Sequence, residues 1–153
     1  MLRMSKLTDY GTLVLAQLAA QQGGIASAGQ VAGATHIGQP TVSKLLKSLA
    51  KAGLVVSERG VQGGYALARA PELISAAEII DALEGPVAIT ECSSGNGACD
   101  LESYCRVGMA WQRINRNIRM ALQHVSLADL QSRSAPLAPP NLKQGLSKTA
   151  AVR

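Results

Sequence analysis

The sequence predicts a mainly α-helical chain with one small β-hairpin and a long helix near the C-terminal end. Three observations predict this fold class: apolar residues recur at helical spacing over residues 8–53, two short alternating segments flank a glycine-rich turn at residues 59–64, and helical spacing returns over residues 107–125. A chain of 153 residues can form one ordinary core, or one small domain and an extension. No apolar run is long enough to span a bilayer, so we expect a cytoplasmic protein without a membrane partner.

Charge is distributed unevenly along the chain. Residues 1–70 carry seven Lys or Arg against two Asp or Glu, residues 71–105 carry seven acids and no Lys or Arg, and residues 106–153 carry eight basic residues against one acid. The formal net charge is +5. Such an excess is compatible with a polyanionic partner but is common in other proteins, so it favours nucleic acid only where the basic side chains share one surface.

The first expected helix begins at Thr8, its N-cap, and ends at Gln22 before two glycines. Asp9 then lies in the first turn, where a carboxylate interacts favourably with the N-terminal end of the helix dipole. From the residues alone, this electrostatic role is the simplest explanation of Asp9.

A helix-turn-helix pattern follows the first helix. A short helix is expected from the N-cap Ser27, with Gln30 in the capping-box position, to about Thr35. After a short turn, a third helix has Pro40 at its first position and ends at Gly53. This arrangement predicts a recognition helix preceded by a short supporting helix.

The third helix leaves hydroxyl and ammonium groups outside its apolar stripe, and residues 39–53 contain no Asp or Glu. An ordinary solvated helix face is the alternative, but such faces usually mix both signs of charge. A face of this composition suits a helix in the major groove of DNA. The expected contacts are Thr41, Ser43, Lys44 and Lys47.

The glycine-rich turn predicts a wing beside the recognition helix. Two short strands, residues 54–58 and 65–68, flank the tip. Glycines allow close approach to the phosphate backbone or minor groove, while a merely flexible turn is the alternative. The expected wing residues are Arg59, Gln62, Gly64 and Tyr65.

All three cysteines fall within residues 91–106: Cys92, Cys99 and Cys105. Thiolates gathered on a glycine-containing loop suit zinc or iron-sulfur chemistry, whereas an odd number of thiols does not suit a closed set of disulfides. Three ordinary buried thiols are the alternative. Because zinc and iron-sulfur centres usually take four ligands, one position stays open.

The remaining chain divides into four segments. Residues 71–90 form a connector helix with a capping box at its start, and residues 91–106 form the cysteine ligand loop. Residues 107–130 form a dimerisation helix with a last capped turn, and residues 131–153 form a disordered, basic tail. The helix–helix seam has apolar residues in steps of four and three, although packing on the chain's own core is the alternative; its members are Val107, Trp111, Ile114, Ile118, Ala121 and Val125.

These segments together resemble the Rrf2 family of winged-helix transcription regulators over roughly residues 1–130. The resemblance rests on the opening SKLTDY, the helix-turn-helix ending in GLV, the wing RGVQGGYAL and the three-cysteine loop. The resemblance implies that residues 1–70 form the DNA-binding domain. It also implies that the protein is a homodimer and binds a double-stranded DNA operator. The likeness is greatest to the subgroup that regulates SUF genes for iron-sulfur cluster assembly, which implies a repressor that senses cluster or redox status through a bound cluster, 2Fe-2S or 4Fe-4S.

The resemblance also bears on the fourth ligand. IscR-like members have five residues in each gap between cysteines and a histidine three residues after the last one, whereas here the first gap holds six and the histidine position is Gly108. NsrR-like members use an aspartate from the first helix of the partner subunit, and Asp9 stands at the matching position. Asp9 is therefore the expected fourth ligand, in competition with a bound water or thiol and with acids of the loop itself: Glu91, Asp100 and Glu102.

Other functional classes are less consistent with the sequence. A zinc-structured or redox cysteine protein, or a cluster carrier that docks a protein partner, would share the thiols but does not require an acid-free recognition helix. An enzyme is not expected, because the sequence offers no histidine beside a nucleophile, no phosphate loop and no recognisable carboxylate pair.

Overall fold

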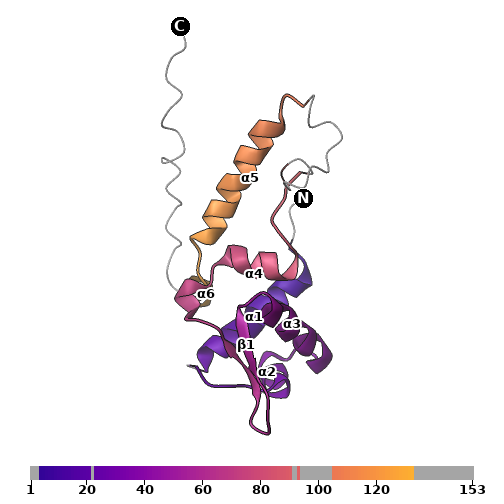
Figure 1. Cartoon of the computed structure of the whole chain (residues 1–153), viewed down its shortest axis with the longest axis vertical. Helices are drawn as coiled ribbons and strands as arrows, with labels where there is room; N and C mark the ends of the chain where they lie inside the picture. Colours follow the sequence, from indigo (N-terminus) through magenta and orange to yellow (C-terminus); the bar gives the residue numbers. More distant parts are fainter. Residues whose placement is uncertain (1–3, 22, 91–92, 94–104, 133–153) are drawn as a thin grey trace.

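The computed structural model describes residues 4–21, 23–90, 93 and 105–132. The predictions made for Cys92, Cys99 and the tail at 133–153 therefore lie outside the described residues. The elements, in chain order, are α1 (Lys6–Ala20), α2 (Ala28–Thr35), α3 (Gln39–Lys51), β1 (Val55–Glu58), β2 (Gly64–Leu67), the 3-10 turn η1 (Pro71–Leu73), α4 (Ala76–Leu83), α5 (Gly108–Gln123) and α6 (Leu127–Gln131). Figure 1 shows α1–α3 and the hairpin as a head, with α4 above it and α5 extending away.

The mainly helical fold with one antiparallel hairpin is confirmed, but the predicted start of the first helix is wrong. The N-cap is Ser5, whose hydroxyl accepts a hydrogen bond from the Leu7 N–H at 3.2 Å. Thr8 lies inside α1, is buried, and donates its hydroxyl to Glu84 at the end of α4. The Ser5 N–H also donates to Glu84 at 2.9 Å, so a distant carboxylate helps to fix where α1 begins.

The helix-turn-helix forms as predicted. In α2 the capping box is complete: Ser27 N–H donates to the Gln30 side chain at 2.8 Å, and Gln30 N–H donates to the Ser27 hydroxyl at 3.2 Å. His36 ends α2 with a φ of 56°, in the left-handed region. The next helix, α3, then begins at Gln39, with Pro40 in its first turn, where its missing N–H costs little.

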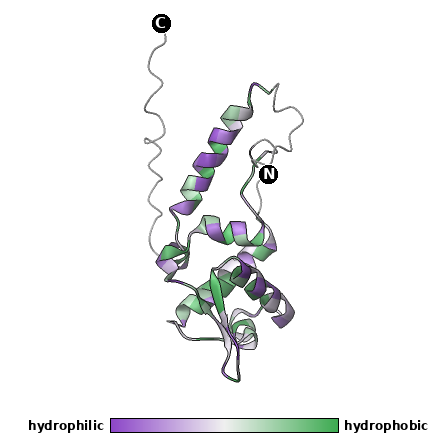
Figure 2. Cartoon of the chain, in the orientation of Figure 1, coloured by the Kyte–Doolittle hydropathy of each residue, from purple (hydrophilic) through white to green (hydrophobic). Residues whose placement is uncertain are grey.

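One core joins the head to α4 and α6. Burying these side chains supplies the main favourable term for folding. Because α4 and α6 contribute Ile79 and Leu127 to the same core, they form one packed unit with the head. Figure 2 shows hydrophobic residues along β1 and mixed hydrophobic and hydrophilic turns along α5. The largest fully buried side chains are Val14, Leu15, Leu18, Val31, Val42, Leu45, Leu46, Leu49, Leu54, Ile74, Ile79 and Leu127.

The wing is tied to the chain between α1 and α2. The strands pair in antiparallel register, with Val55 opposite Leu67 and Glu58 opposite Gly64. Ala26 adds a short bridge to Tyr65, through N–H to carbonyl distances of 2.9 and 2.8 Å. Strand β2 is therefore hydrogen-bonded on both sides, to β1 and to Ala26.

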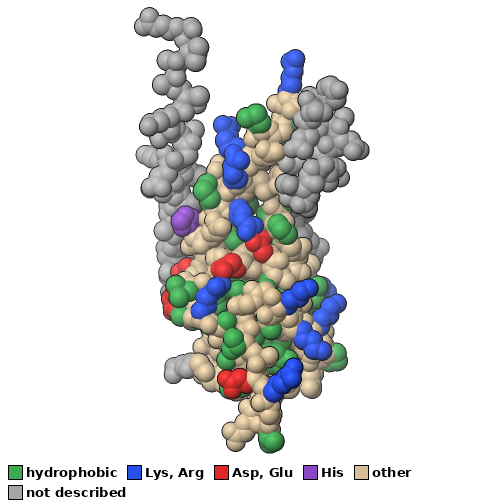
Figure 3. Space-filling view, in the orientation of Figure 1, with side chains coloured by type: hydrophobic (Ala, Val, Ile, Leu, Met, Phe, Trp, Pro, Cys, Tyr) green, Lys and Arg blue, Asp and Glu red, His purple; other side chains and the backbone are tan. Residues whose placement is uncertain are grey.

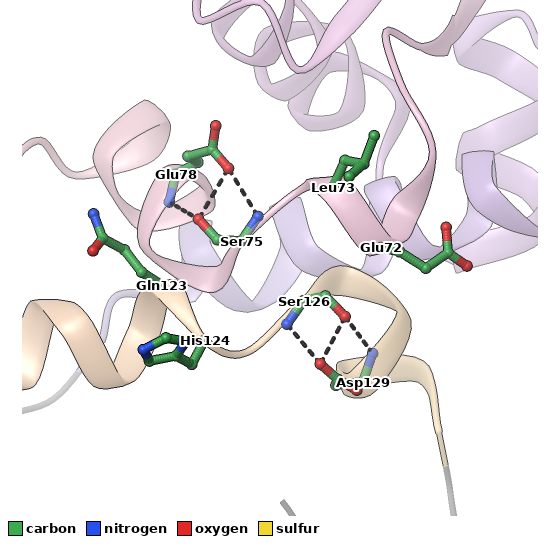
Figure 4. Close-up of a pocket in the computed structure, with 8 residues that line it drawn as sticks. All are labelled: Glu72, Leu73, Ser75, Glu78, Gln123, His124, Ser126 and Asp129. Carbon is green, nitrogen blue, oxygen red and sulfur yellow. Dashed lines mark hydrogen bonds between the residues drawn. The ribbon is translucent and has the colours of Figure 1, made fainter. Parts of the chain in front are cut away.

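Two complete capping boxes meet where α4, α5 and α6 converge. Ser75 pairs with Glu78 and Ser126 pairs with Asp129, and all four line one pocket (Figure 4). Backbone hydrogen bonds between residues 74–76 and 125–127, at 2.7 and 2.8 Å, hold the two helix starts together. This junction fixes the point from which α5 extends. No helix in the described part of the chain is long and apolar enough to cross a membrane.

Candidate nucleic-acid interface and cysteine region

The buried stripe of α3 determines which of its side chains face outward. Val42, Leu45, Leu46 and Leu49 are at most 2% exposed, which fixes the rotation of the helix. Lys44 and Lys47 are then exposed, and Thr41 and Ser43 are half-buried beside them. Figure 3 shows Lys and Arg side chains on the part of the head formed by α3. The helix presents donors and positive charge, the chemistry that phosphates and base edges require.

The wing tip is a compact turn with three exposed side chains. The Gly63 N–H donates to the Gly60 carbonyl at 3.0 Å, and Gly60 has a φ of 127° that favours glycine. Arg59 and Gln62 are exposed, and their contact with DNA stays a prediction. Val61 is also exposed, although the sequence analysis gave this residue of the turn no role.

The two other predicted wing residues begin β2, directly after the turn. Gly64 is buried, and a Cβ there would lie 2.5 Å from the Ala26 carbonyl oxygen, so only glycine fits. Tyr65 is half-buried and packs against the core. Their position supports the wing from within, while the tip carries the exposed groups.

The apolar seam predicted for the long helix is largely unpacked in the single chain. Val107, Trp111 and Ile114 are 57%, 39% and 41% exposed. Ile118, Ala121 and Val125 are half-buried. An apolar row left partly in water along a projecting helix is typical of a surface that another chain covers.

Beside the seam on α5, Asn115 holds the segment that leads into the cysteine region. Its amide donates to the Val87 carbonyl at 2.9 Å and to the Ser93 carbonyl at 3.4 Å, and its oxygen accepts from the Ile89 N–H at 3.3 Å. Asn115 is only 7% exposed, so losing these bonds would leave polar groups buried without partners. Sequence reasoning missed it, because an asparagine on a helix is usually a surface residue.

Cys105 is the cysteine that the structure describes. It is a free, half-buried thiol directly before α5, and a Cβ at Gly108 would lie 3.6 Å from its sulfur. The absence of a side chain at Gly108 leaves space beside the sulfur. The entrance to the cysteine region through Ser93 and its exit at Cys105 are therefore both attached to α5.

Asp9, the predicted fourth ligand, is exposed on α1 at the rim of an apolar groove between α1, α4, α5 and α6. Within residues 4–21, 23–90, 93 and 105–132, no three His, Cys, Asp or Glu side chains converge as a metal site. The apolar lining of the groove comprises Met4, Leu13, Ala76, Ile79, Ile80, Leu122 and Leu130.

A helix-turn-helix with an acid-free, exposed second helix, followed by an anchored wing, defines a winged-helix DNA-binding protein. The sequence matches the model of the Rrf2 family, described as "Iron-dependent Transcriptional regulator", over residues 4–133. The chain belongs to this family of transcriptional regulators.

Curated relatives and solved structures agree with this assignment. The chain is 31% identical to the HTH-type transcriptional regulator CymR of Bacillus subtilis over 132 residues, which is 86% of this chain and 91% of CymR. The structure of CymR, the global cysteine regulator of B. subtilis, superposes on this chain with a TM-score of 0.67 at 31% identity. The match covers 88% of this chain and all of CymR. IscR of T. potens superposes with a TM-score of 0.61 at 30% identity, covering 84% of this chain and 85% of that IscR chain.

Proposed function

We propose that this regulator is a cytoplasmic homodimer that represses its operator, and that an iron-sulfur cluster held by Cys92, Cys99 and Cys105 sets its affinity for DNA. One observation carries the proposal: Cys105 lies at the start of α5, and this helix has an exposed apolar seam on one face and contacts to the head on another. A change at the cysteines therefore acts on the element that positions the head.

The seam of α5 supports the dimer. Trp111 and Ile114 expose large apolar side chains that a second copy would remove from water. The apolar groove beside Asp9 is a second surface of the same chemistry. A second copy of the chain can cover both the seam and this groove. Two heads joined through α5 would then read two half-sites about 34–36 Å apart, the spacing of one DNA turn.

The donor chemistry of the cysteine region fits a cluster. Thiolates are the protein ligands that iron-sulfur clusters prefer, and the one described thiol, Cys105, is free and has space beside it. Such a cluster supplies a centre that oxidants or ligands can alter. Asp9 of a second copy is the proposed fourth ligand, because it lies on the rim of a groove that the second copy would cover.

On DNA, α3 would enter the major groove with Thr41, Ser43, Lys44 and Lys47. Hydroxyl groups reach base edges or phosphates, and the ammonium groups pair with phosphates or guanine acceptors. In the wing, Arg59 and Gln62 would reach the backbone or minor groove, while Gly64 and Tyr65 hold the strands in place for them.

The genes for iron-sulfur cluster assembly are the proposed target, because a cluster that is lost when clusters are scarce reports the need for assembly. The resemblance to the SUF regulators and the family description as iron-dependent support this target. A cysteine-responsive regulator without a cluster is the second candidate, since the relative CymR is described as a cysteine regulator.

The visible absorption spectrum of the full chain, purified without oxygen, separates these candidates. The proposal predicts a brown protein with bound iron and sulfide, and a colourless variant when all three cysteines are replaced by alanine. A colourless wild-type protein, with stoichiometric zinc or with no metal, would overturn the cluster and leave the DNA-binding assignment intact.

A further inference from the structure

Val61 is the most exposed of the large hydrophobic residues that the structure describes. Its relative exposure is 108%, compared with 83% for Met109 and 46% for Val56 on strand β1 of the same wing. Figure 3 shows a hydrophobic side chain at the end of the hairpin, beyond the rest of the head. Val61 therefore makes no packing contribution to the described fold and is the side chain that would first meet a surface approached by the wing.

The turn that carries Val61 is constrained rather than loose. A Cβ at Gly63 would lie 2.4 Å from the Glu58 carbonyl oxygen, so the backbone there is too close for any other residue. The Gly63 N–H to Gly60 carbonyl bond of 3.0 Å closes the turn. A tip of fixed shape keeps Val61 pointing outward at little cost in conformational entropy when a ligand binds.

The surroundings of the tip suit nucleic acid. Arg59 lies next to the turn on one side, and a groove on the side of α2 has no charged side chain among its lining residues. Within the hairpin, residues 55–67, the one acid is Glu58, at the end of β1. The groove is lined by glycines, polar groups and apolar side chains: Gly23, Gly24, Ile25, Ser27, Gln30, Val61, Gln62 and Gly63.

We propose that Val61 is an apolar specificity residue of the wing, which enters the minor groove of the operator and packs against sugars and base edges. Apolar side chains inserted there read groove width and the ease of separating base steps. Arg59 supplies attraction to phosphates, whereas Val61 supplies a sequence-dependent contact without charge. The inference rests on the DNA-binding function of the family and is independent of the cluster.

The test compares Val61→Thr with Val56→Thr in the full chain. Both changes replace one methyl group by a hydroxyl and keep a β-branched side chain, so shape and strand propensity are preserved. The probe is a duplex selected from a random-sequence pool by the wild-type protein. Val61→Thr is expected to weaken binding on the order of fivefold, and Val56→Thr to leave it unchanged.

Salt dependence provides a second measurement. Val61→Thr should keep the wild-type slope of affinity against salt, because no phosphate contact is lost, whereas Arg59→Gln should reduce the slope by about one. Replacing guanine by inosine in the duplex removes an amino group from the minor groove only, so its effect should be larger on wild type than on Val61→Thr.

Equal affinities of wild type, Val61→Thr and Val56→Thr would overturn the role of Val61. A reduced salt slope in Val61→Thr would also overturn it, since the effect would then be electrostatic. If wild type itself selects no duplex from the pool, the DNA-binding function fails and not only the wing contact, so the two failures are distinguishable.

Discussion

Arg119 on α5 donates two parallel hydrogen bonds to the carboxylate of Asp81 on α4. Nη1 donates to Oδ1 at 2.9 Å and Nη2 donates to Oδ2 at 2.5 Å, and these bonds raise the pKa of Arg119. Because α4 contributes to the core of the head, this pair links the long helix to the part that reads DNA. Two-point geometry of this kind resists rotation better than a single charge contact.

Breaking this pair should weaken the link between α5 and the head. Arg119→Gln and Asp81→Asn are each expected to lower the free energy of unfolding by about 1 kcal/mol or less, because both groups are about one-third exposed. A double-mutant cycle by urea unfolding should show a coupling energy of about 0.5–1 kcal/mol. Arg113→Gln is the matched control, since Arg113 is exposed and forms no ion pair within the described residues. A coupling energy of zero would show that the Arg119–Asp81 pair does not link α5 to the head.

The apolar seam of α5 predicts a dimer that one charge can disrupt. Ile114→Glu would place a carboxylate at the centre of the buried surface, and the dissociation constant is expected to rise more than about tenfold. Met109→Glu is the control, because Met109 is 83% exposed and lies on another face of the helix. Sedimentation equilibrium measures the dimer dissociation constant of each variant. A dimer unaffected by Ile114→Glu would show that the interface lies elsewhere.

The lysines of α3 should act through phosphate charge. Lys44→Gln and Lys47→Gln are each expected to weaken binding to duplex DNA and to lower the slope of log affinity against log salt by about one. Lys51→Gln serves as the control at the C-terminal end of the same helix. Thermal unfolding should change little for all three, because the side chains are exposed. An unchanged slope for Lys44→Gln and Lys47→Gln would mean that α3 does not face the phosphates.

The carboxylate of Glu84 gives the start of α1 a pH dependence. Hydrogen bonds from the Thr8 hydroxyl and then from the Ser5 N–H lower the pKa of Glu84 below its ordinary 4.5. A lowered pKa contributes stability above the unfolded-state value, and this stability is lost as the pH falls through the folded-state value. Glu84→Gln should therefore be less stable than wild type at pH 7, by roughly 0.5 kcal/mol for so exposed a group, with the difference vanishing in acid. A difference that persists unchanged at low pH would contradict this assignment.

Local signals were sufficient for most of the fold. The capping boxes at Ser27 and Ser75, the proline in the first turn of α3 and the glycine-rich turn of the wing all act within a few residues, and each forms as predicted. The rotation of α3 also followed from its apolar stripe, because burial of that stripe leaves one orientation.

Contacts between distant residues could not be read from the sequence. The sequence predicts a start of α1 at Thr8, and it gives no sign that Glu84, 76 positions away, accepts a hydrogen bond from the Thr8 hydroxyl. Likewise, Asn115 looks like a surface residue until the segment at 87–93 is seen to fold against it. The pairing of Arg119 with Asp81 likewise depends on how α4 and α5 are placed relative to each other, 38 positions apart in the chain.

The central proposal is that the cysteine region controls the affinity of the two heads for DNA. The most direct test measures the affinity of the protein purified without oxygen, with its cluster content known, for one selected duplex. The comparison is a folded, dimeric variant with Cys92→Ala, Cys99→Ala and Cys105→Ala. The account predicts affinities that differ by about tenfold or more, a typical size for coupling between two sites. Equal affinities across the same salt series would contradict it.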